Sequence, residues 1–246
     1  MKKIKEIKTI AFDAMFLALI FVFAYVPYLG YITIGPLSFT TMHVLVLLGA
    51  ILFGAKRGAL YGFFFGVSSL LVALQYPGTL NYFCLNPFIS IVPRVLFGLI
   101  AGLVFDSLKK NCTQKTFNIV SIPLCGVFTL LHTVLYFTFF YVFGVKDVFG
   151  ITSLLGVADL IESMNSTYGS LLGFIGSYMS IGCVCEIAVA IVLIGAIYLP
   201  VSKFLGLGRV KTIEEREVKK GNIAFNTTLV ITLFALLCVI ILSMAL

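Results

Sequence analysis

Seven apolar stretches run along the chain, separated by short clusters of charged, polar, Pro and Gly residues. A helix that crosses a bilayer needs about 20 apolar residues, and the second and third stretches are short for a full span. Short, Gly-interrupted helices are tolerated in a membrane only where neighbouring helices or a cavity satisfy the backbone. The pattern predicts an all-α integral membrane protein with helices over residues 9–29, 41–54, 59–74, 86–105, 118–143, 169–199 and 225–246.

The composition is that of a protein embedded in lipid. Of the 246 residues, 61% are hydrophobic and 11% are charged, and the mean hydropathy is +1.13, whereas soluble chains carry about 25% charged residues. This polar content is too small to cover a water-exposed domain, so soluble enzyme folds and disorder are excluded. The net charge of +7 does not indicate nucleic acid, because the basic residues lie in short connectors between apolar stretches.

The basic residues fall on alternate connectors, and this orients the chain. They gather in the N-terminal tail, at Lys56 and Arg57, at 109–115 and in the linker 201–221. Lys- and Arg-rich connectors stay in the cytoplasm, so we expect a multi-pass protein of the cell membrane with a cytoplasmic N-terminus. Residues 222–246 are expected to form an additional C-terminal transmembrane helix. The opposite connectors hold only Lys146; they are 30–40, 75–85 and 144–168.

No motif for catalysis or nucleotide binding occurs in the chain. It lacks H-E-x-x-H, G-x-S-x-G, paired carboxylates at helical spacing and G-x-x-x-x-G-K-[ST]. We therefore expect no enzyme, and no ability to power transport with ATP without partners. Cys183 and Cys185 form the one close cysteine pair and lack the second pair that a zinc site needs, so no metal or other cofactor is predicted.

Arg94 is the most informative of the ionisable residues inside the apolar stretches. It stands eight residues after Asn86 and directly after Pro93, in the outer half of its helix. A guanidinium there can bind a carboxylate that enters from outside. The alternatives are a structural pair with Asp13 or Glu186, or snorkelling towards the interface.

The other polar candidates lie beside the outer connectors or deeper in the helices. His43 follows an aromatic, amide-rich connector directly and can donate to a ligand or cap its helix. His132 is in mid-helix, where a hydrogen bond to a neighbouring helix is the simpler interpretation. Asp13 and Glu186 are interpreted as packing partners. The outer loops can cover a pocket or form an ordinary aromatic belt; in the first case the substrate-binding residues are His43, Asn81, Asn86, Ser90 and Arg94.

Small residues recur at four-residue spacing on several helices, which lets helices approach closely. Most of these stripes are interpreted as packing within the bundle. They are Ala14-x-x-x-Ala18, Gly58-x-x-x-Gly62-x-x-x-Gly66, Gly98-x-x-x-Gly102 and Gly169-x-x-x-Gly173.

Several of these pieces together resemble the substrate-binding S components of energy-coupling factor (ECF) vitamin transporters. They are the stretch from Ile34 to Gly66, with its basic turn between glycines, the sequences Asn86-Pro-Phe-Ile-Ser90 and Val92-Pro-Arg-Val-Leu-Phe-Gly98, and the Ala14 and Ala18 pair. The resemblance covers about residues 8–200, and it is strongest to pantothenate-type members.

This resemblance implies a six-helix substrate-binding domain over residues 1–200, with its site at the outer end under the first and third outer loops. It also implies that Ala14 and Ala18 face a transmembrane coupling subunit, which works with two ATPase subunits. The expected ligand is a small water-soluble vitamin, with pantothenate, riboflavin, folate and related vitamins left open. The alternative is a self-sufficient, proton-coupled secondary transporter that uses His43, Arg94, His132 and Glu186.

Overall fold

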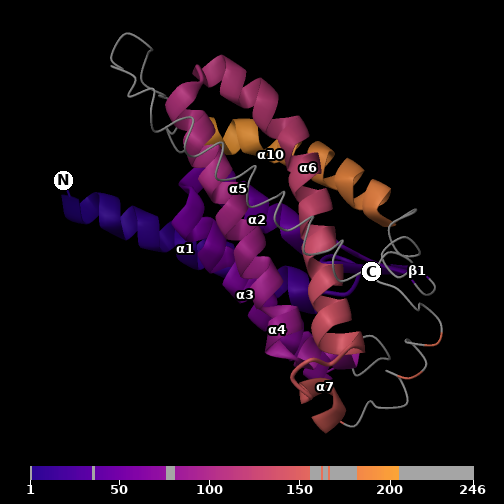
Figure 1. The fold of residues 1–246 in the computed structure, drawn as a ribbon. Helices are drawn as coiled ribbons and strands as arrows, with labels where there is room; N and C mark the ends of the chain where they lie inside the picture. The colour runs from indigo at the N-terminus through magenta and orange to yellow at the C-terminus, as the bar shows by residue number, and fades with distance from the viewer. Residues whose placement is uncertain are drawn as a thin grey trace.

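The computed structural model describes residues 2–34, 37–75, 81–155 and 182–204, together with positions 162 and 166 (Figure 1). In chain order the elements are α1 (Lys2–Tyr25), β1 (Tyr31–Ile34), β2 (Leu37–Thr40), α2 (Met42–Phe53), α3 (Ala55–Gln75), the 3₁₀-helix η1 (Asn81–Leu85), α4 (Pro87–Ser90), α5 (Val92–Asn111), α6 (Gln114–Phe140), the π-helix η2 (Tyr141–Val145), α7 (Ile151–Leu154) and α10 (Gly182–Phe204).

The predicted all-α membrane class is confirmed. Four helical segments are long and apolar enough to cross a membrane: Ala55–Gln75, Pro87–Asn111, Gln114–Val145 and Gly182–Phe204. The expectation that the second apolar stretch is short holds, since α2 has 12 residues. The seventh stretch, the linker beyond residue 204 and residues 169–181 lie outside the described residues.

The expectation that the third stretch is short was wrong. Helix α3 has 21 residues, because it begins at Ala55 and includes Lys56 and Arg57 in its first turn. The charge pair that was interpreted as a break is therefore part of the helix. Arg57 tolerates this position because its Nε atom donates to the carboxylate of Asp13 on α1 at 2.8 Å.

The connector 30–40 contains a two-stranded antiparallel hairpin, whereas the sequence led us to expect only a loop. Tyr31 pairs with Thr40, and Ile34 pairs with Leu37. Tyr, Ile, Thr and Phe favour strands, but the same aromatic and apolar residues are also typical of a pocket lining. The Thr41 amide donates to the Gly30 carbonyl at 2.9 Å, and this bond closes the hairpin base directly before α2.

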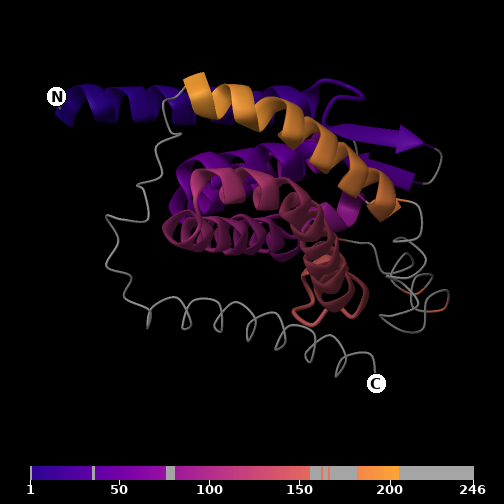
Figure 2. The same cartoon turned by 90° about the horizontal axis from the view of Figure 1, so that it is seen from above.

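Helix α2 is the centre of the bundle. Eleven consecutive residues, Met42 to Leu52, are buried. Seen from above, α1 and α10 lie along one side with α2 beneath them (Figure 2), and α2 also contacts α3, α5 and α6. A helix too short to span can stand here because other helices, rather than lipid, surround it. Polar groups on α2 therefore face protein.

Helices α3 and α5 pack backbone to backbone through their glycines. A Cβ atom added at Gly98 would lie 2.0 Å from the Gly58 carbonyl oxygen, and one added at Gly62 would lie 2.2 Å from the Arg94 carbonyl oxygen. The packing role expected for these stripes on α3 and α5 is thus confirmed, while Gly169 and Gly173 lie outside the described residues. The close approach holds the backbone of Arg94 against α3.

Candidate functional site

Arg94 is the third residue of α5, directly after the break between α4 and α5 at Ile91, and it is 5% exposed. Its Nη1 atom donates to the carbonyl oxygens of Ile89 and Ser90 on α4, both at 2.7 Å. Its Nε atom is buried and has no hydrogen-bond partner, and Nη2 donates to none of the described residues. The edge of the guanidinium formed by Nε and Nη2 is therefore available to a ligand. Two parallel N–H groups on such an edge match the two oxygens of a carboxylate.

Two aromatic rings flank the guanidinium. The Cζ atom of Arg94 lies 5.0 Å from the ring centre of Phe65 on α3 and 4.8 Å from that of Tyr136 on α6. Such cation–π contacts stabilise a desolvated guanidinium. They also restrict its orientation, so the charge is held in place before any anion arrives.

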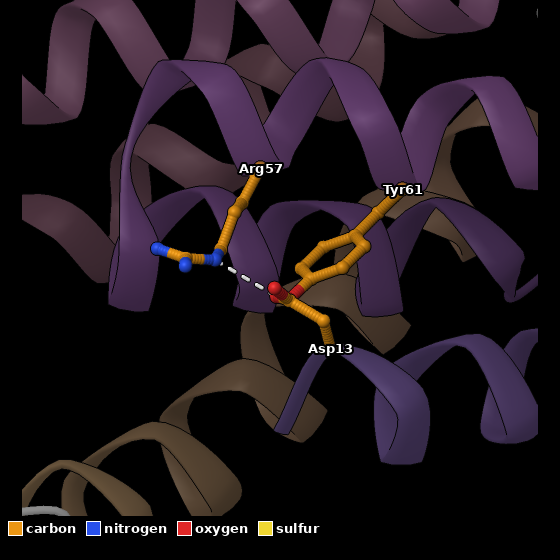
Figure 3. A network of polar contacts seen from close by, with 3 residues as sticks. All are labelled: Asp13, Arg57 and Tyr61. Atoms are coloured by element: carbon orange, nitrogen blue, oxygen red, sulfur yellow. Dashed lines mark hydrogen bonds and ion pairs between the residues drawn. The ribbon is translucent and has the colours of Figure 1, made fainter. Parts of the chain in front are cut away.

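The carboxylates proposed as structural partners of Arg94 bind elsewhere. Asp13 accepts from Arg57 and also from the Tyr61 hydroxyl at 2.6 Å, and Figure 3 shows this network between α1 and α3. Glu186 on α10 accepts from the Thr40 amide at 2.8 Å and from the Thr133 hydroxyl at 3.3 Å. Glu186 therefore holds the hairpin against α10 and α6, and no carboxylate within the described ranges pairs with Arg94.

The polar residues before Arg94 shape the turn that positions it. The Asn86 side chain accepts from the Phe88 amide at 3.0 Å as the N-cap of α4, and it donates to the Phe143 carbonyl at 3.3 Å. The Ser90 hydroxyl donates to the Cys84 carbonyl. Asn81 begins η1, and its side chain lies outside the described part of the structure. Contacts of these three residues with a substrate stay a prediction.

The structure brings His43 and His132 together next to Arg94. Their rings stack with centres 5.6 Å apart, and the His132 ring packs edge-on against Phe97 at 5.0 Å. His43 is 0% exposed and His132 is 3% exposed. The Thr40 backbone lies near His43, but none of the four ring nitrogens has a hydrogen-bond partner in the described part of the chain. The prediction that His132 makes an interhelical hydrogen bond is therefore wrong. The face of α6 that carries His132 packs against aromatic rings and His43.

Tyr31 and Ser69 complete the polar surroundings of Arg94, and neither was predicted from the sequence. The two hydroxyl oxygens lie 2.6 Å apart and link the hairpin to α3. Burial raises the pKa of the Tyr31 phenol, and the nearby Arg94 guanidinium partly offsets this rise, so the phenol is neutral at physiological pH. The only available signal was the aromatic character of the connector 30–40, which does not identify one tyrosine.

The sequence matches the family model described as the ECF transporter, substrate-specific component, over residues 8–198. The chain belongs to this family. It is therefore a substrate-binding subunit of a membrane transporter, and its family is not one of enzymes. It is also similar to the pantothenate transporter PanT of Leuconostoc mesenteroides subsp. mesenteroides, with 29% identity over 214 residues, which cover 81% of this chain and 96% of that protein.

Helix α1 of this S component turns its small residues away from the bundle. Ala14 and Ala18 are both exposed, whereas Phe16 and Ile20 on the opposite side of the helix are buried. Within the described residues the alanine stripe is thus free of internal packing. The Asp13 network of Figure 3 fixes α1 against α3 beside this stripe.

Proposed function

We propose that this protein is the substrate-binding membrane subunit of an ATP-driven ECF importer and that its ligand is pantothenate. The observation that carries the proposal is the buried Arg94 guanidinium, which has an unpartnered edge and no carboxylate partner among the described residues. Pantothenate has a carboxylate to bind this edge, and riboflavin has none. The likeness to PanT supports the same ligand.

The ligand carboxylate binds side-on to Nε and Nη2 of Arg94. A hydrogen bond to a charged group contributes about 1.5 to 3 kcal/mol. The neutral phenol of Tyr31 and the Ser69 hydroxyl lie beside it and can bind a second polar group. Because Arg94 is already held by two carbonyl oxygens and two rings, little side-chain entropy is lost on binding.

The energy for transport comes from other subunits. The chain has no phosphate-binding loop, so ATP hydrolysis has to be supplied by two ATPase subunits through a transmembrane coupling subunit. We place the contact with the coupling subunit on the exposed face of α1 that carries Ala14 and Ala18. Small residues let a second helix approach closely in a membrane.

Reconstitution tests this function against a self-sufficient secondary transporter. We expect the purified chain to bind pantothenate alone, and proteoliposomes to accumulate radiolabelled pantothenate only when the coupling subunit, both ATPases and ATP are present. Uptake by the chain alone, driven by a pH gradient, would overturn the ATP-driven mechanism. Absence of pantothenate binding would overturn the ligand.

We also propose that the N-terminus and the connection between α5 and α6 face the cytoplasm. In Figure 2 the N-terminus lies at the opposite end of the bundle from the β1–β2 hairpin. Lys110 and Lys146 are exposed on the two predicted sides. In a variant without native cysteines, a cysteine at position 110 should react with a membrane-impermeant maleimide only in inside-out vesicles, and one at 146 only in intact cells. The reverse pattern would invert the site.

A further inference from the structure

The unpartnered polar atoms of the described residues concentrate at one place. Among the described residues six buried side-chain nitrogen and oxygen atoms lack a hydrogen-bond partner, and five of them belong to His43, His132 and Arg94. An unsatisfied buried polar atom destabilises the folded state, so folded proteins rarely keep one without a function. Five in one cluster indicate a site that is completed by a polar ligand.

The histidines and the guanidinium belong to the same site. The Phe65 ring lies 5.0 Å from Cζ of Arg94 and 5.8 Å from the His132 ring. The His132 ring in turn stacks on the His43 ring, with centres 5.6 Å apart. A ligand held by Arg94 at one end can therefore reach the imidazoles with its other end.

The hydrogen-bonding chemistry of His43 and His132 determines which ligand group they can bind. A neutral imidazole carries one donor and one acceptor nitrogen, and a hydroxyl group likewise donates and accepts. We propose that His43 and His132 bind the hydroxyl groups of the ligand whose carboxylate binds Arg94, and so select hydroxylated acids over plain ones. This inference rests on the proposed function, since pantothenate carries its hydroxyl groups at the end opposite its carboxylate.

Binding of a hydroxyl group also explains why the polar side chains of His43 and His132 lie in an apolar core. A site built to hydrogen-bond a hydroxyl group rejects an analogue without it, because its own buried groups then stay unpaired. Asn86 and Ser90, which were expected to share this task, already have protein partners. His43 and His132 have no hydrogen-bond partner among the described residues, so they are the available specificity-determining residues.

The test compares pantothenate with an analogue that keeps the β-alanine and the amide but lacks both hydroxyl groups. Calorimetry on the full chain in detergent gives both affinities for wild type, for His132→Phe and for His43→Phe. His132→Phe keeps a ring between Phe65 and Phe97 and removes both nitrogens. We expect it to weaken pantothenate binding about tenfold or more and to leave analogue binding unchanged. His43→Phe should likewise weaken pantothenate binding and leave analogue binding unchanged.

Thr129→Val is the matched control. Thr129 is buried on α6 about one turn before His132, and its hydroxyl donates to the Cys125 carbonyl at 3.0 Å. This variant should bind both compounds as wild type does. The melting temperature of ligand-free His132→Phe should not fall, because the change removes buried unpartnered atoms.

Two results would overturn the inference. Equal losses for both compounds would make the histidines packing residues, and unchanged pantothenate affinity in both Phe variants would remove them from the site. The wild-type affinity for pantothenate decides the proposed function separately.

Discussion

Arg94→Lys should weaken pantothenate binding by about tenfold or more, since lysine keeps the charge but cannot present two parallel N–H groups to a carboxylate. Arg94→Met removes the charge as well, and the loss of a charge-assisted pair of about 1.5 to 3 kcal/mol predicts up to about a hundredfold weaker binding. Both are measured by calorimetry on the purified chain, with the melting temperature recorded in parallel.

Two comparisons separate binding from structure. The neutral primary amide of pantothenate should bind wild type more weakly than the acid does, and this difference should shrink in Arg94→Met. Arg57→Lys is the matched control, because Arg57 is paired with Asp13 and lies outside the site. If both Arg94 variants kept wild-type affinity while their melting temperatures fell, Arg94 would only hold the Ile89 and Ser90 carbonyls of α4.

Ala14→Trp or Ala18→Trp should abolish ATP-dependent uptake in proteoliposomes while pantothenate affinity stays within about twofold of wild type. A bulky ring on the exposed stripe prevents the close helix approach that small residues allow. The stripe lies on the side of α1 opposite the buried Phe16 and Ile20, so the substitution leaves the packing of the bundle intact. Uptake and affinity are measured on the same preparations.

Val127→Trp is the control for bulk in the membrane. Val127 is 55% exposed on α6, which is separated from α1 by other helices in the view of Figure 2. It should keep both uptake and binding. Equal losses of uptake and affinity in the Ala14 and Ala18 variants would mean that the stripe supports the fold rather than the coupling subunit.

The sequence by itself determined the class of the protein and the approximate positions of its helices. A bilayer demands long apolar helices, so hydropathy alone locates them. It also identified Arg94, because an ionisable residue is costly in lipid and stands out in an apolar stretch. The glycine stripes on α3 and α5 were predictable for a similar reason, since small residues at helical spacing have few other uses in a membrane.

Only the tertiary structure decided how these residues combine. The partners of Asp13 and Glu186 lie on other helices or strands, and hydropathy carries no information on which helices are neighbours. For the same reason, the stacking of His43 on His132 and the aromatic rings around Arg94 could not be predicted from the sequence. The start of α3, where a hydrogen bond across to Asp13 lets Arg57 lie within the helix, could not be predicted either. The role of a polar group in a membrane protein depends on the residues that pack beside it. Here the packing of α2 between its neighbouring helices determined which residues those are.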